Sequence, residues 1–295
     1  MMSKSVILFA ISSIALARVS GAEFTNLFPN LGESNTFDSY NSVALGSQGG
    51  WSSWTTSSIP GGATSSSYRI TSDPAPGAAL VKSLRITTAA TSSTADAQTV
   101  INSAERYAYQ TIPWGLRAAG QDCLVMNFST YIPSNGVLTN SKAQFYGSIR
   151  TVDGFDLGGI GVRSGDGRVY IYQSEKIYDS NTNSYIKIHW VRDTTFNVEL
   201  DVWNKFQIGL IGGSPTFNFT STLGAQSISI GQAGFGFGLS DPRYIMLSST
   251  AGGSTANEQI AISGYFDSVG AYAVVPSPSV FALIGLSVFG SRRRL

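Results

Sequence analysis

Apolar and polar residues alternate along much of the middle of the chain. In residues 169–172, Val-Tyr-Ile-Tyr, the aliphatic side chains fall on one face and the tyrosines on the other. The same period of two recurs in residues 186–190, 196–202, 206–210 and 217–219. Because successive side chains of a strand point to opposite faces, each segment predicts a β-strand. No stretch of useful length has the periodicity of an amphipathic helix.

Short turn sequences separate these expected strands. Gly-Asp-Gly at 165–167 and Gly-Gly-Ser-Pro at 212–215 are typical of tight turns. Many short strands joined by such turns predict an all-β, antiparallel sandwich or barrel. We expect one such domain over residues 23–273, because neither half alone offers enough strands for two sheets.

Composition supports this interpretation and narrows the function. Hydrophobic residues make up 42% of the 295 residues, which is ample for a core, whereas charged residues make up only 13%. Cys123 is the single cysteine, so no disulfide forms within the chain, and a buried, inert thiol is expected. One His and one Cys far apart in sequence do not make a standard zinc site.

The first 22 residues have the pattern of a secretion signal. Lys4 precedes an apolar run at 6–17, and Ser-Gly-Ala at 20–22 provides the small side chains that a signal peptidase requires. We therefore expect a signal peptide over 1–22, with cleavage between Ala22 and Glu23. The partner at this step is the export machinery.

The last residues, 274–295, form a second distinct segment. Pro276, Ser277 and Pro278 lie in an extended linker, and an apolar run at 280–290 follows. As a helix, those eleven residues would span about 16 Å, against about 30 Å for a bilayer core. Three arginines then hold the end on the cytoplasmic side of a membrane: Arg292, Arg293 and Arg294. A short, positively terminated helix of this kind suits a transient membrane stop.

This tail resembles the PEP-CTERM sorting signal of Gram-negative bacteria, in which a Val-Pro-x-Pro-Ser start, an apolar segment and an arginine cluster follow one another. Ser277 occupies the position of the family's central Glu. The resemblance implies processing near Pro276 to Pro278 by an exosortase-like enzyme. We expect the apolar runs at the two ends of the chain to form short hydrophobic helices. It also implies a location at the cell envelope, the cell surface or the extracellular matrix.

The body resembles a concanavalin A-like (laminin-G-like) jelly roll. The likeness rests on residues 36–40 with Gly-Gly-Trp at 49–51, on 202–208 around Trp203, and on the closing segment 264–269. It implies that the first and last strands of the domain are neighbours. Asp38 and Asp267 lie in these two segments, and sandwiches of this class often join them through a structural Ca²⁺, which takes oxygen ligands. No other cofactor is expected.

Charge excludes one class of partner. Of 19 basic residues, five lie in the terminal segments, which leaves 14 basic against 18 acidic residues and a body charge of −4. The body contains no Lys/Arg cluster, so nucleic-acid binding through phosphate neutralisation is not expected.

Extracellular polysaccharide is the better candidate ligand. Tyr170 and Tyr172 share one strand face, and Tyr185 and His189 share a face of a later strand. If these faces adjoin, they form an aromatic, hydrogen-bonding surface suited to pyranose rings. The alternative is that these tyrosines pack beneath loops or cover the second sheet.

Glu199 and Asp201 are the sharpest hint of catalysis. At positions i and i+2 of a strand they would share a face, as in retaining glycosidases and in the laminarinase-like β-glucanases that the segment resembles. The final Glu of that pattern is replaced by Trp203 or Asn204. We therefore expect no catalytic residues, and an exported, surface- or matrix-associated structural protein. The alternative is a polysaccharide-binding module, and a glycoside hydrolase or lyase comes third.

Overall fold

The computed structural model of the chain describes the greater part of residues 24–275. The described residues are 24–28, 36–55, 67–72, 74, 81–88, 105–134, 143–152, 154–181, 183–211, 214–221, 224–229, 242–250 and 261–275. The signal peptide expected over 1–22 and the sorting-signal residues from Pro276 to Arg294 lie outside them. Within the described residues, no helix has the length and apolar character needed to cross a bilayer.

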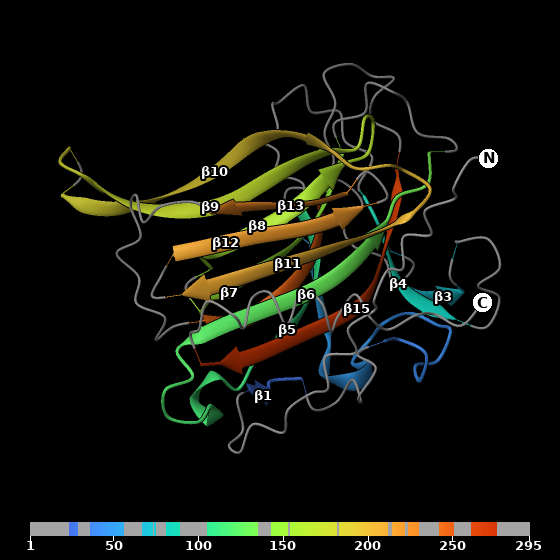
Figure 1. The fold of residues 1–295 in the computed structure, drawn as a ribbon, viewed down its shortest axis with the longest axis horizontal. Helices are drawn as coiled ribbons and strands as arrows, with labels where there is room; N and C mark the ends of the chain where they lie inside the picture. The colour runs from blue at the N-terminus through green and yellow to red at the C-terminus, as the bar shows by residue number, and fades with distance from the viewer. Residues whose placement is uncertain are drawn as a thin grey trace, which may run out of the picture.

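Two antiparallel sheets face each other (Figure 1). The larger, here the eight-stranded sheet, runs in the order β13-β12-β11-β6-β15-β4-β3, and β1 also pairs with β15. Its strands are β1 (Phe24–Asn26), β3 (Tyr68–Ser72), β4 (Lys82–Thr87), β6 (Cys123–Tyr131), β11 (Trp203–Ile211), β12 (Ser214–Ser221), β13 (Gly224–Ser229) and β15 (Ser263–Val274).

The seven-stranded sheet runs in the order β10-β9-β8-β7-β14-β5-β2. Its strands are β2 (Ser52–Thr55), β5 (Glu105–Thr111), β7 (Gln144–Thr151), β8 (Asp156–Arg163), β9 (Arg168–Asp179), β10 (Ser184–Asn197) and β14 (Pro242–Thr250). Two short 3₁₀ helices, η2 (Gln48–Gly50) and η4 (Trp114–Leu116), complete the regular structure of the described residues.

Aromatic side chains from both sheets fill the space between them. The Phe128 ring of β6 stacks on the Phe206 ring of β11, with centroids 5.3 Å apart. Across the interface Phe128 lies against Gly147 of β7, where an added Cβ would meet its ring at 2.5 Å. Gly264 of β15 receives Phe145 of β7 in the same way, at 2.3 Å. The two glycines let the sheets approach closely enough for these rings to interlock.

The fold class predicted from the alternation is confirmed: the body is an antiparallel β-sandwich of the jelly-roll type. The turn expected at 165–167 lies between β8 and β9. The first and last described strands are neighbours, since Phe24 of β1 pairs with Val274 of β15. The segment expected to supply the first strand, around Asp38, instead consists of bends and turns.

The hairpin formed by β9 and β10 extends beyond the rest of its sheet. β8 pairs with β9 only over Val169–Tyr172, whereas the β9–β10 pairing continues to Asp179 and Ser184. In Figure 1 this hairpin projects past the other strands at the left of the molecule.

Candidate binding face of the seven-stranded sheet

The outer face of the seven-stranded sheet, turned away from the core, carries many polar and aromatic residues. Along β7, Phe145 and Ile149 belong to the core, and the alternate residues Gln144, Tyr146 and Arg150 project to the other side. Register extends this face to β8, β9, β14 and β5. The predicted sugar-contacting residues belong to this same face.

A buried charge network lies on it. The Arg150 guanidinium contacts Asp156 through Nε at 2.7 Å and through Nη2 at 3.2 Å, and its Nη2 also lies 3.1 Å from Glu105 Oε1. The Tyr146 hydroxyl donates a hydrogen bond to Glu105. All three charged side chains are less than 10% exposed. The guanidinium fork thus bridges two carboxylates from two other strands.

Burial and charge have opposite effects on Arg150. Burial alone lowers the pKa of its guanidinium, but Asp156 and Glu105 outweigh this and raise the pKa well above its ordinary value. Burial, followed by the charge of Glu105, raises the pKa of Tyr146 well above that of a free phenol. The network therefore holds a charged arginine and a neutral tyrosine at ordinary pH.

Tyr172 stacks on Tyr146. Its hydroxyl donates to Gln144 Oε1, and only 2% of the residue is exposed. The predicted ligand contact thus lies within a stack of two rings instead of presenting its ring to solvent.

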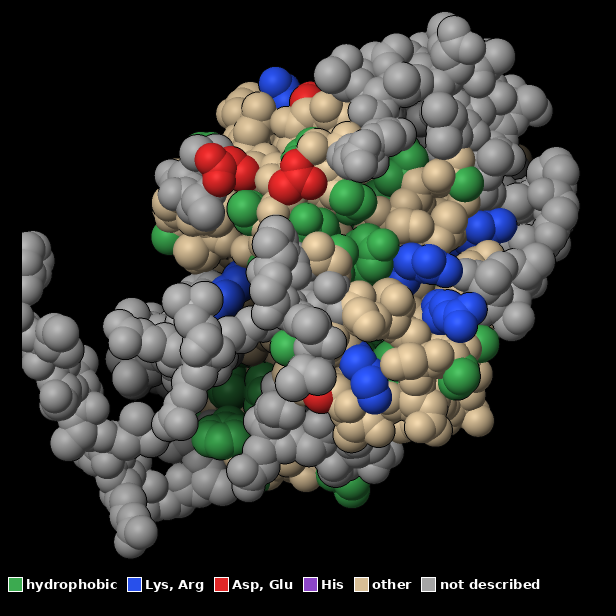
Figure 2. Space-filling model, turned by 90° about the vertical axis from the view of Figure 1, so that its right-hand side faces the viewer, with side chains coloured by type: hydrophobic (Ala, Val, Ile, Leu, Met, Phe, Trp, Pro, Cys, Tyr) green, Lys and Arg blue, Asp and Glu red, His purple; other side chains and the backbone are tan. Residues whose placement is uncertain are grey.

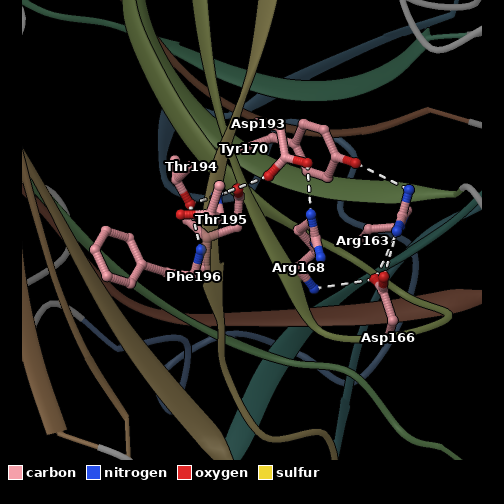
Figure 3. A network of polar contacts seen from close by, with 9 residues as sticks. Arg163, Asp166, Arg168, Tyr170, Asp193, Thr194, Thr195 and Phe196 are labelled. Atoms are coloured by element: carbon pink, nitrogen blue, oxygen red, sulfur yellow. Dashed lines mark hydrogen bonds and ion pairs between the residues drawn. The ribbon is translucent and has the colours of Figure 1, made fainter.

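Tyr170 is half-buried and fixed by an edge network (Figure 3). Its hydroxyl accepts a hydrogen bond from Arg163 Nη1 at 2.9 Å, and Arg163 also pairs with Asp166. Arg168 donates to Asp193 Oδ2 at 2.7 Å. The network joins the β8–β9 turn to β10, and it accounts for the polar residues of that turn.

Tyr185 and His189 lie at matching register positions on the same hairpin. Tyr185 pairs with Tyr178, and His189 pairs with Ser174, two residues beyond Tyr172. The backbone therefore brings all four predicted positions to one face of β9 and β10. The side chains of Tyr185 and His189 lie outside the described part of the structure.

A row of tyrosines farther along the face was not predicted from sequence. Tyr107 and Tyr109 of β5 have ring centroids 5.7 Å apart, and Tyr109 lies 5.4 Å from Tyr244 of β14. All three are half-buried, and the Arg150 guanidinium lies 5.4 Å from the Tyr107 ring centroid. The sequence did contain a signal for Tyr107 and Tyr109: in residues 105–111, Glu-Arg-Tyr-Ala-Tyr-Gln-Thr, the two tyrosines alternate with other residues and so share one face of a strand.

A pocket of about 390 Å³ lies at the end of this row. Its lining includes Trp114, Arg117 and Arg243. The Arg117 guanidinium lies 4.5 Å from the Trp114 ring centroid, and Arg243, next to Tyr244 in the chain, is exposed. Two arginines and an aromatic ring thus contribute to the lining of this pocket, and Arg243 is the chain neighbour of Tyr244 in the tyrosine row.

The strand expected to carry Glu199 and Asp201 is absent. β10 ends at Asn197 and β11 begins at Trp203, so both carboxylates belong to the connection between them. Asp201 has a φ of 62° and accepts a hydrogen bond from the Ser134 backbone N–H at 2.8 Å. The prediction that the two residues share a strand face is therefore wrong, because a left-handed turn interrupts the alternation.

Asp38 and Asp267, the two predicted calcium ligands, lie in different surroundings. Asp38 accepts hydrogen bonds from the Lys82 backbone N–H at 2.7 Å and from the Thr36 hydroxyl at 3.0 Å. Asp267 is fully buried in β15, next to a register shift. Among the described residues, no three His, Cys, Asp or Glu side chains gather in a way that could hold a metal ion.

No protein-family model matches the chain, and no curated protein matches it. Several solved structures are similar to the chain in fold. An endo-β-1,4-glucuronan lyase from the fungus Trichoderma reesei is 10% identical, with a TM-score of 0.48 over 78% of this chain and 93% of the lyase. A Bacteroides ovatus mixed-linkage glucan GH16 protein is 11% identical, with a TM-score of 0.44 over 75% and 93%. The CBM2 module of a Lactobacillus casei phage Dit protein is 10% identical, with a TM-score of 0.37 over 58% and 70%.

Proposed function

We propose that this chain is an exported, surface-associated β-sandwich protein that binds polysaccharide without cleaving it. The tyrosine row Tyr107–Tyr109–Tyr244 carries this proposal. Half-buried aromatic rings on the outer face of a sheet offer apolar area to the faces of sugar rings, and their hydroxyls offer hydrogen bonds. The adjoining pocket, with Trp114 and Arg117, would receive the end or a branch of the glycan.

Delivery to the cell surface rests on the terminal segments. A basic start, an apolar run and small residues precede position 23, and Pro276–Pro278 with Arg292–Arg294 follow the body.

The state of the carboxylates supports binding without catalysis. Glu105 and Asp156 are the acids of the charge network on this face, and both are engaged by Arg150 and buried. A general acid or nucleophile must reach the substrate. Their engagement with Arg150 favours a structural role.

The test is retention of the purified full-length chain on insoluble cellulose, chitin and β-1,3-glucan. We expect retention on at least one, and roughly three- to tenfold weaker binding for Tyr109→Ala and Tyr244→Ala, from the loss of ring stacking. Phe24→Ala, which removes an exposed ring from the other sheet, is the matched control. Lack of retention on every glycan, or equal binding by all variants, would overturn the binding proposal.

Delivery has its own test, the mass of the protein recovered from its native host. A chain that begins at Glu23 and ends near Pro276 is expected. A chain that keeps its whole tail in the inner membrane would contradict sorting.

A further inference from the structure

A single lateral row crosses the outer face of the eight-stranded sheet. Trp203 of β11 pairs in register with Tyr131 of β6, and Tyr131 pairs with Tyr265 of β15. Tyr265 pairs with Arg85 of β4, and Arg85 pairs with Arg69 of β3. Three aromatic residues are thus followed by two arginines, in one line perpendicular to the strands.

These residues lie on the face away from the core. The alternate residues Phe206, Phe128, Phe266 and Leu84 belong to the core cluster. Within the row, the centroid of the Tyr131 ring lies 5.6 Å from that of Trp203 and 6.2 Å from that of Tyr265. Trp203, Tyr265 and Arg85 are half-buried, and Arg69 is exposed. The aromatic part is therefore a packed platform, and the row opens to solvent toward its arginine end.

The arginine pair is the unusual feature. Like charges directly opposite each other on adjacent strands destabilise a sheet. Arg69 forms no ion pair with another described residue. Figure 2, which looks at the side of the molecule where β3 and β4 lie, shows several basic side chains close together. Arg69 is exposed beside Arg85, and two neighbouring guanidinium groups suit the planar fork of a carboxylate.

We propose that this row is a second glycan site, specific for an acidic polysaccharide built from uronic acids. Arg69 and Arg85 bind a sugar carboxylate, and Tyr265 and Trp203 stack on neighbouring sugar rings. Strands lie about 4.8 Å apart, so the row is roughly 19 Å long, which suits an extended chain lying across the strands.

The aromatic part favours a glycan over an acidic peptide or a nucleic acid. An acidic peptide offers no regularly spaced ring faces, and a nucleic acid would need more phosphate contacts than two arginines supply. A uronic-acid chain combines one carboxylate per sugar with a ring face that can stack, and the row offers both partners side by side. The site is independent of the tyrosine row, because the two lie on different sheets.

The test measures binding of the full-length chain to polygalacturonate, with dextran as the neutral probe. Dextran sulfate, polyglutamate and single-stranded DNA are the other polyanions compared. We expect binding to polygalacturonate that weakens with added salt. Arg69→Gln should weaken it roughly three- to tenfold, and Arg69→Gln/Arg85→Gln further. Arg192→Gln, which removes an exposed arginine from β10, should leave it unchanged.

Tyr265→Ala separates a glycan site from a merely basic patch, because it should weaken binding to polygalacturonate without reducing its salt dependence. Thermal unfolding verifies that each variant is folded. Equal binding of Arg69→Gln and Arg192→Gln would overturn the proposal. So would tighter binding to dextran sulfate, polyglutamate or single-stranded DNA than to polygalacturonate. Loss of binding in Tyr109→Ala, but not in Arg69→Gln, would place all glycan binding on the other sheet.

Discussion

The Tyr146 ring stacks on the Tyr172 ring with centroids 4.1 Å apart and an interplanar angle of 16°. The two residues belong to β7 and β9, which are separated by β8, and the stack forms above that intervening strand. Gly161 of β8 pairs with Tyr146, and Gly159 pairs with Tyr172. Because these positions have no side chain, rings from non-adjacent strands meet over them.

The first prediction concerns Gly161. A Cβ there would lie 2.2 Å from the Tyr146 Cβ and 2.3 Å from the Phe145 carbonyl oxygen. Since the second contact is with backbone, the strands must move apart, and we expect Gly161→Ala to lower the free energy of unfolding by about 1–3 kcal/mol. Denaturant unfolding measures this loss. Gly115→Ala, where nothing lies within 4 Å, is the control, and equal stability of the two variants would contradict the prediction.

The second prediction concerns Arg150. Arg150→Gln leaves Glu105 and Asp156 buried without their cation, and removing one partner of a buried ion pair costs about 3–5 kcal/mol. We expect a loss of that size in the free energy of unfolding at neutral pH. Arg168→Gln, which breaks the more exposed pair with Asp193, should cost much less. If the two variants are equally stable, the buried network contributes no more than a surface pair.

The sequence was sufficient for the fold because strand alternation is a local signal. Residues 169–172 alternate as predicted: Val169 and Ile171 are buried in the core cluster, and Tyr170 and Tyr172 lie on the other face. What alternation could not show is that the other face is also covered. Tyr172 is buried because a ring from β7 reaches it over two glycines, and that contact depends on sheet order.

The charge network could not be predicted from the sequence either, because it also depends on the order of the strands in the sheet. Arg150 and Glu105 are 45 residues apart, and they meet only because β14 lies between β5 and β7. Glu199 and Asp201 show the opposite error. Their alternation resembled a strand, but the left-handed φ of Asp201 ends the pattern, and a sequence period does not reveal such a turn.

The third prediction concerns alkaline pH. Burial raises the pKa of Tyr146 and of Tyr172 well above that of a free phenol. In the unfolded chain both lose their protons near pH 10, whereas in the folded chain they stay protonated. The unfolded state then binds fewer protons, so the free energy of unfolding should fall as pH rises through about 10.

Two measurements check this prediction. Denaturant unfolding should show the decline, and Tyr172→Phe should make it shallower. For these two tyrosines, the phenolate absorbance of the folded protein should rise at a higher pH than that of the unfolded chain. Tyr172→Phe should remove one of the groups that titrate at the higher pH. If the native and the unfolded chain titrate together, these tyrosines are accessible and the stack is open in solution.

The last prediction concerns Cys123, which lies on β6 among Val125 and Val274 and is fully buried. Burial raises the pKa of its thiol to about 12. Because the thiolate is the reactive form, Cys123 should not react with a thiol reagent at mildly alkaline pH until the protein unfolds. The rate of labelling, followed with increasing denaturant, should rise with the unfolded fraction. Fast labelling of the native chain would mean that the edge formed by β15 and β1 opens without global unfolding, because β15 carries Val274 over this thiol.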